Sequence, residues 1–393
     1  MMQRPRDFFS EDYLDALLAG MDGTRRELEK IAQASEAVAQ RFVSAGELFI
    51  ASVRSDFVSE GIVRAGGLML LKAYTAAVAL SEKDTIIFGW SNTTPQADLE
   101  LLRSLHKTGA FVLGIGPIPV QEVADEFLSH VDVFLQSSLP LPSTVTTRFR
   151  GECYPLISLQ NLVVLWTFTG EVVAALTRQG FMAAMYQSVC VPQARERNAK
   201  FHHHRFHETH AVGPIPPEQL GRTYLEKLNE CLSAVREQEI AAIEAVAQVC
   251  TSVRKAGHHI YASLVSHFPV HQLSAPGDPT FMQRLEHISG ETPSAAELAE
   301  KLQPGDLFFF LGYYRRPVEA YETARRAGAR IVEVIAGTHT PPPQYPQPDY
   351  VIRPKWPYGD ALVVVPNYDI KILPGSGIVQ TAIYWVVVGV MLA

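Results

Sequence analysis

Residues 85–96 read Thr-Ile-Ile-Phe-Gly-Trp-Ser-Asn-Thr-Thr-Pro-Gln, and this stretch decides the fold. The apolar run 85–89 is typical of a strand that is buried on both faces of a parallel sheet. A polar turn follows, and Pro95 then opens a predicted helix that extends to His106. A buried strand that leads through a short turn into a helix is the repeating unit of α/β proteins.

The same alternation continues on both sides of this stretch. An apolar stripe at steps of three and four residues predicts a long amphipathic helix over residues 11–43. Further strands are expected at 48–53, 110–114 and 131–135, and a long apolar helix at 156–176 closes the first half. We therefore expect a doubly wound α/β domain, with a parallel sheet of roughly five strands between helices.

The second half repeats this order. A helix over about 217–255 leads to strands near 257–263, 304–310 and 328–335, and an apolar helix again ends the half. The offsets between corresponding segments drift, as insertions in loops would cause, so we infer a tandem duplication of one α/β domain. The predicted division is a first domain at 1–195, a His-rich linker at 196–216 and a second, degenerate domain at 217–393.

Composition excludes several classes of protein. The 393 residues carry a formal charge of −7, so we expect no nucleic-acid partner, because duplex binders normally present a basic face. Four cysteines without a CxxC pair favour reduced thiols in a cytoplasm. The apolar stretch 378–393 is shorter than the roughly 20 residues that span a bilayer, so we expect a buried helix and no membrane contact.

The polar turn after the strand 85–89 is the best candidate for a ligand site. Ser91, Asn92, Thr93 and Thr94 stand directly before a helix, where hydroxyls and backbone N–H groups together favour an anion such as phosphate. In open α/β sheets, ligands bind beyond the carboxyl ends of the strands, which is where this turn lies. The alternative is that Ser91 or Thr93 only caps the helix.

The order of motifs in the first half resembles the sugar isomerase (SIS) domain family. The resemblance rests on Arg54-Ser55, on Glu60, on the stretch Arg-Ala-Gly-Gly-Leu at 64–68 and on the Ser-Asn-Thr-Thr turn, and it covers about 12–200. It is closest to the bacterial phosphosugar-binding branch. The resemblance implies tandem domains that bind a phosphosugar where strands end and domains meet. We expect no cofactor.

The resemblance also implies roles for individual residues. The phosphosugar-binding residues would be Ser55, Arg64, Ser91, Asn92, Thr93 and Thr94. Isomerisation through an enediol requires a base, for which Glu60 is the candidate, with His207 assisting proton transfer. The alternative is that Glu60 forms a helix-surface ion pair with Arg64 at i,i+4. The first loop, Ala-Ser-Val-Arg-Ser at 51–55, departs from the family's glycine-rich turn, and side chains there restrict the approach of phosphate.

The corresponding loops of the second half lack the hydroxyl turn. Ser263, Ser266 and His267 follow its first strand and are the predicted ligand-binding residues there. Arg315 and Arg316 follow its second expected strand, where they either clamp an anion by charge or lie solvated at a helix start. Before the last helix, Ser376 is either part of an anion site or a helix cap.

The cluster His202, His203, His204, His207 and His210 leaves three possibilities open. It could form an interdomain or surface cluster, ligate zinc through His203 and His207 on one helical face, or supply the histidine that assists Glu60. We predict no resident metal.

The leading functional hypothesis is a ketose–aldose isomerase that acts on a sugar phosphate. The alternatives are a non-catalytic phosphosugar sensor and, less favoured, a histidine-ligated metalloprotein. We expect a monomer, in which the two domains pair as a pseudo-dimer, or a homodimer.

Overall fold

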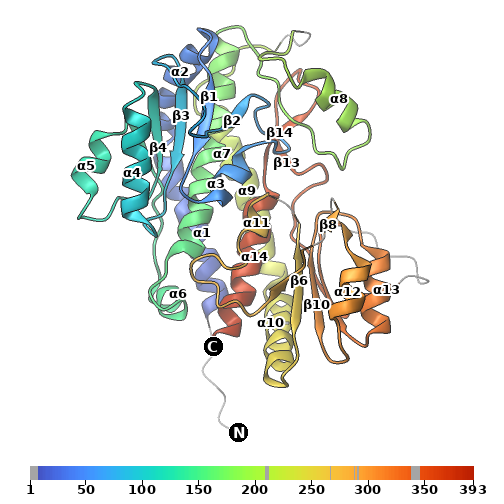
Figure 1. Cartoon of the computed structure of the whole chain (residues 1–393). Helices are drawn as coiled ribbons and strands as arrows, with labels where there is room; N and C mark the ends of the chain where they lie inside the picture. The colour runs from blue at the N-terminus through green and yellow to red at the C-terminus, as the bar shows by residue number, and fades with distance from the viewer. Residues whose placement is uncertain (1–7, 209–211, 266, 287, 290–291, 338–345) are drawn as a thin grey trace.

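Two five-stranded parallel sheets form the framework of the protein (Figure 1). The computed structural model describes residues 8–208, 212–265, 267–286, 288–289, 292–337 and 346–393. Central helices lie between the two sheets, and further helices cover their outer faces. The α/β class and the doubled sheet expected from the sequence are thereby confirmed.

The first sheet has the strand order β2-β1-β3-β4-β5, with every neighbouring pair parallel. Its strands are β1 (Leu48–Ala51), β2 (Leu71–Ala73), β3 (Thr85–Gly89), β4 (Phe111–Gly116) and β5 (Val133–Gln136). The strand expected at 85–89 has those bounds, and all five of its residues are buried. β2 was not expected from the sequence. It follows the Arg-Ala-Gly-Gly-Leu stretch directly and forms the edge of the sheet beside β1.

The second sheet repeats this topology. Its order, β12-β11-β10-β6-β7, is that of the first sheet read from the opposite edge, so that β6 corresponds to β1 and β10 to β3. Its strands are β6 (Ile260–Leu264), β7 (Gln283–Arg284), β10 (Leu307–Leu311), β11 (Arg330–Val334) and β12 (Tyr350–Ile352). Two antiparallel pairs lie outside the sheets: β8 (Ile288–Ser289) with β9 (Thr292–Pro293), and β13 (Ala361–Val364) with β14 (Lys371–Pro374).

Fourteen helices complete the described part of the chain. They are α1 (Phe9–Arg26), α2 (Leu28–Val43), α3 (Ser55–Gly61), α4 (Pro95–His106), α5 (Ala124–Ser129), α6 (Ser143–Arg148), α7 (Tyr154–Arg178), α8 (Ala194–Phe201), α9 (Gln219–Gln238), α10 (Ile240–Lys255), α11 (His267–Val270), α12 (Ala295–Lys301), α13 (Val318–Arg326) and α14 (Ser376–Met391). Each of the two long helices expected from the sequence is in fact a pair. Glu27 and Glu239 each serve as the C-cap of one helix and the N-cap of the next. The apolar stripe continues across both breaks.

The apolar helices α7 and α14 form the centre of the molecule (Figure 1). α7 is long and apolar enough to cross a membrane, but its whole apolar window is buried inside the protein, as a core helix requires. The stretch expected as a buried helix at 378–393 is α14, and 15 of its 16 residues are buried. α1 packs against both helices, so one continuous core joins the two halves.

The Arg-Ala-Gly-Gly-Leu stretch fixes the contact between the halves. The carbonyl of Gly66 accepts a hydrogen bond of 2.9 Å from the N–H of Leu373 on β14. Gly66 has a φ of +77°, and a Cβ at this position would lie 2.7 Å from the Leu373 nitrogen. Only glycine permits both the left-handed backbone and this close approach. The division of the chain into two domains and a linker, with boundaries at 195/196 and 216/217, stays a prediction.

Candidate functional site

A cleft of about 620 Å³ opens where β3, β4 and β5 end, and we call it the first cleft. Its walls are the loop after β3, the loops after β4 and β5, and the segment before α7. The lining residues that carry polar side chains are Ser91, Asn92, Thr93, Gln136, Ser137, Ser138, Glu152 and Cys153. Parallel strands deliver their following loops to one edge of the sheet, which explains why the loops after β3, β4 and β5 meet here.

The loop at 91–94 presents an array of hydrogen-bond donors. Within the described part of the chain, none of its backbone N–H groups donates a hydrogen bond. The hydroxyls of Ser91 and Thr93 lie 2.9 Å apart and bond to each other, while the Asn92 amide donates to the Ile118 carbonyl at 2.7 Å. Because Pro95 begins α4 directly afterwards, the positive end of a twelve-residue helix lies at this loop. This combination favours an anion.

Ser137 adds a second donor to the first cleft. It lies one residue beyond β5, its side chain is 3% exposed, and its hydroxyl has no hydrogen-bond partner in the structure. A buried hydroxyl without a partner costs about 1–3 kcal/mol, so such groups usually bond to a ligand or water. We infer that a ligand in the first cleft would meet the Ser137 hydroxyl.

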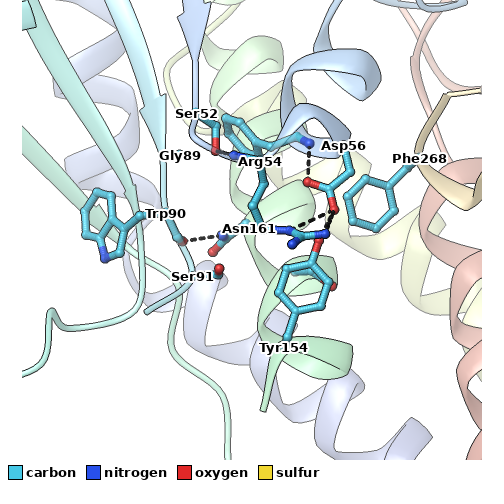
Figure 2. Close-up of a pocket in the computed structure, with 11 residues that line it drawn as sticks. Ser52, Arg54, Asp56, Gly89, Trp90, Ser91, Tyr154, Asn161 and Phe268 are labelled. Carbon is cyan, nitrogen blue, oxygen red and sulfur yellow. Dashed lines mark hydrogen bonds and ion pairs between the residues drawn. The ribbon is translucent and has the colours of Figure 1, made fainter. Parts of the chain in front are cut away.

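A polar cluster lies behind the loop, between β1, β3 and the start of α7 (Figure 2). The Asp56 carboxylate accepts hydrogen bonds from the Arg54 guanidinium, the Phe57 N–H and the Tyr154 hydroxyl. The Arg54 guanidinium also lies 4.3 Å from the centre of the Tyr154 ring. The Asn161 amide donates to the Trp90 carbonyl at 2.7 Å and so holds the end of β3. The cavity in this cluster has only about 10 Å³, room for one water. It supports the first cleft and is too small for a sugar.

Asp98 lies one helical turn beyond the loop and is 2% exposed. Burial raises the pKa of its carboxyl to about 7, against the lowering effects of the Thr94 hydroxyl, 3.4 Å away, and of Arg54. Burial therefore brings the pKa of this carboxyl, in the first turn of α4, close to neutral pH.

The structure places the predicted base, Glu60, in a buried network of charges. Its carboxylate is 0% exposed and accepts a bond of 3.0 Å from Arg64 Nε. Burial raises the pKa of Glu60, although Arg64 opposes this. Arg64 Nη1 in turn lies 2.8 Å from the Asp360 carboxylate of the second half. The ion pair considered from the sequence is thus present, and it is buried where a surface pair was expected.

Ser376 completes this Arg64 network, which consists of Glu60, Arg64, Asp360 and Ser376. Arg64 Nη2 donates to the Ser376 hydroxyl at 2.5 Å, and the Asp360 carboxylate accepts from the Ser376 N–H at 2.8 Å. The first turn of α14 is therefore occupied by a carboxylate of the chain itself. Burial lowers the pKa of Arg64, but Asp360 and Glu60 outweigh it and hold that pKa well above its usual value. Arg64 connects the halves and does not reach the first cleft.

His207 lies apart from Glu60, in a packed environment. The residue is 4% exposed, and the centre of its ring lies 3.8 Å from that of Phe201. Its backbone N–H donates to the Met182 carbonyl at 2.7 Å. The helix expected to align His203 with His207 ends at Phe201, because α8 stops there. His210 lies outside the described residues. Among those described, no three metal-ligating side chains come together.

The remaining predicted residues are distributed over both halves. Ser55 is exposed at the start of α3, where its neighbours Ser52 and Arg54 line the polar cluster instead. Ser263 is fully buried on β6 with an unpartnered hydroxyl, and Ser266 lies outside the described residues. His267 Nδ1 lies 3.2 Å from the Ser59 carbonyl. Burial, assisted by Arg64, lowers the pKa of His267 to about 4.

Sequence reasoning missed Ser137, Asp98 and Glu152. Ser137 follows an expected strand and could have been found by the rule that placed the loop at 91–94. Glu152 precedes α7, and its carboxylate accepts the Tyr154 N–H at 2.8 Å. Asp98 carries no local signal beyond its place in the first turn of a helix.

Comparison with solved structures identifies the fold. No protein-family model and no curated protein matches the sequence. The C-terminal domain of glucosamine-fructose-6-phosphate aminotransferase from Francisella tularensis matches 95% of this chain and 96% of its own, with a TM-score of 0.50 and 10% identity. A protein of Clostridium difficile 630, provisionally named a phosphosugar isomerase, matches 98% of this chain and 91% of its own, with a TM-score of 0.54 and 8% identity. The chain therefore has the fold of tandem sugar isomerase (SIS) domain proteins, as its sequence motifs implied.

Proposed function

We propose that this protein binds a phosphorylated sugar in the first cleft. The observation that carries the proposal is the loop at 91–94. Its N–H groups donate to no described residue, it precedes the start of α4, and Ser91, Asn92 and Thr93 line the cleft. The two solved structures support it, because their names refer to a sugar phosphate and to a phosphosugar. The cleft volume of about 620 Å³ lies within the 300–1,000 Å³ typical of small-molecule sites.

The chemistry of the lining suggests how the ligand lies. The phosphate would accept hydrogen bonds from the loop amides, the Thr93 hydroxyl and the Ser137 hydroxyl, at the positive end of α4. The sugar would then extend along Ile118 and Ile157, with Gln136 able to bond its hydroxyls. The site needs no metal or cofactor to hold a dianion, since amide and hydroxyl donors suffice.

Binding is tested by titrating fructose 6-phosphate and glucosamine 6-phosphate against fructose in a calorimeter, after a thermal-shift panel. We expect the phosphorylated sugars alone to bind, and Thr93→Val to weaken them by about tenfold, because one hydrogen bond to a charged group is lost. Ser104→Ala, on the exposed face of α4, is the matched control. If no phosphosugar binds, or if one binds and neither Thr93→Val nor Ser91→Ala changes its affinity, the proposal fails.

A second candidate function is isomerisation of the bound sugar, as a ketose–aldose isomerase. Glu152 favours it, because this half-buried carboxylate lines the same cleft as Thr93 and is held at the start of α7. An enediol route needs one base near the carbons that exchange a proton. We expect Glu152→Gln to reduce turnover by at least about 100-fold with little change in binding. The same assay on Glu60→Gln and His207→Ala tests the bases assigned from the sequence.

A sensor without catalytic activity is the remaining proposal. Tight binding of a phosphosugar, with no turnover and no effect of Glu152→Gln or Glu60→Gln, would favour it over an isomerase. A cytoplasmic location and a monomeric or homodimeric state also stay proposals. Light scattering on the purified chain decides between the two oligomeric states.

A further inference from the structure

A second cleft, of about 710 Å³, opens at the carboxyl ends of β6 and β10. These strands correspond in sheet order to β1 and β3, so the second cleft stands at the edge of its sheet that holds ligands in open α/β folds. Val265 follows β6, and Tyr313 and Arg315 follow β10. The segment 186–190 and the helix α8 supply the opposite wall.

The second cleft has an excess of positive charge. Arg195 and Arg315 both line it, and neither guanidinium group forms a hydrogen bond or ion pair with any described residue. The acidic side chain in the lining is Asp360, which Arg64 neutralises at 2.8 Å. His267 adds no charge at neutral pH, because burial and Arg64 lower its pKa to about 4. Two of the residues that line this cavity therefore carry a guanidinium group without a partner carboxylate among the described residues.

The rest of the lining is suited to a hydroxylated molecule. Ser188 contributes a hydroxyl and Gln187 a carboxamide, and Tyr186 and Tyr313 supply aromatic surface. Guanidinium groups bind planar oxyanions by paired N–H donors, a geometry that carboxylate and phosphate share. The loop after β10 lacks the Ser and Thr residues of the loop after β3, so an anion here would be recognised by charge.

We propose that the second cleft binds a hydroxylated organic anion, held by the guanidinium groups of Arg195 and Arg315, independently of any ligand in the first cleft. The two arginines come from different segments, α8 and the loop after β10, so a ligand that bonds to both would connect them. The site is separate from the polar cluster and from the loop at 91–94, with which it shares no lining residue.

The probe is 6-phosphogluconate, which carries a carboxylate, a phosphate and hydroxyls. It is titrated in a calorimeter into the full chain carrying Thr93→Tyr, which fills the first cleft. We expect binding at one site per chain, weakened at least about tenfold by adding Arg195→Ala and Arg315→Ala. Arg330→Ala, an exposed arginine at the amino end of β11, is the control and should leave the affinity within twofold. Gluconate and glucitol 6-phosphate distinguish carboxylate from phosphate recognition.

Equal affinity with and without the two arginines, or no binding of 6-phosphogluconate to the Thr93→Tyr protein, would overturn the proposal. Both arginines are exposed, so their replacement should leave the circular dichroism and the melting temperature unchanged. Arg315→Lys, which keeps the charge but not the paired donors, should bind with intermediate affinity. Failure of the first-cleft proposal is recognised separately, because fructose 6-phosphate binding would then be insensitive to Thr93→Val.

Discussion

Replacement of Asp98 by Asn should make the protein more stable at alkaline pH and flatten the pH dependence of its stability. In the folded chain, burial raises the pKa of Asp98 from its ordinary 3.8 to about 7. Between these values the folded protein binds a proton that the unfolded chain has released, so stability falls as the pH rises through this window. The limiting loss is about 1.36 × (7 − 3.8), or roughly 4 kcal/mol. Between pH 5 and pH 8 it is about 2–3 kcal/mol.

The assay is urea denaturation of the wild-type and Asp98→Asn chains at pH 5 and pH 8, followed by circular dichroism. Asn has the shape of the protonated acid and keeps a partner for the Thr94 hydroxyl, so the variant lacks this titration and little else. We expect the stability advantage of Asn to be larger at pH 8 than at pH 5 by about 2–3 kcal/mol. Parallel pH profiles for the two proteins would show that burial does not shift this carboxyl, and the reasoning would be refuted.

Two further predictions concern the contact between the halves. Arg64→Met should destabilise the chain by about 3–5 kcal/mol, because it leaves the carboxylates of Glu60 and Asp360 buried without their cation. Urea denaturation measures this loss of stability. Adding Glu60→Gln and Asp360→Asn to the Arg64→Met chain should restore most of it. Gly66→Ala should cost more than Gly109→Ala, which serves as its control. Both glycines have a φ of +77°, but a Cβ at Gly109 meets nothing within 4 Å, so the control measures backbone strain alone, about 1 kcal/mol. Equal melting temperatures for the two variants would contradict the close approach described at Gly66.

The fold was predictable where local pattern and tertiary environment agree. The strand at 85–89 is apolar throughout because helices cover both faces of the sheet, so its bounds followed from composition alone. The break at Glu27 was not predictable, because the apolar stripe keeps its phase across it. β2 has only three residues and one exposed lysine, too short for alternation to be recognised.

The part of the candidate site that could be predicted is the part formed by residues close together in the sequence. The loop at 91–94 combines its hydroxyls, strand end and helix start within a few residues, so the sequence indicates it directly. Ser137 reaches the candidate site because β5 lies beside β4 in the sheet. The order of segments along the sequence does not show which strands are neighbours. The pairing of Glu60 with Arg64 at i,i+4 could be recognised in the sequence. The second carboxylate partner of Arg64, Asp360, lies 296 positions further along the chain and could not.

Each half of the chain contributes a side chain to the lining of a cavity in the other half. Phe268 of the second half lines the polar cluster of the first, and Arg64 of the first half lines the second cleft. Either half alone would therefore lack part of the lining of its own cavity. We therefore expect that expressing either half by itself would yield an insoluble fragment.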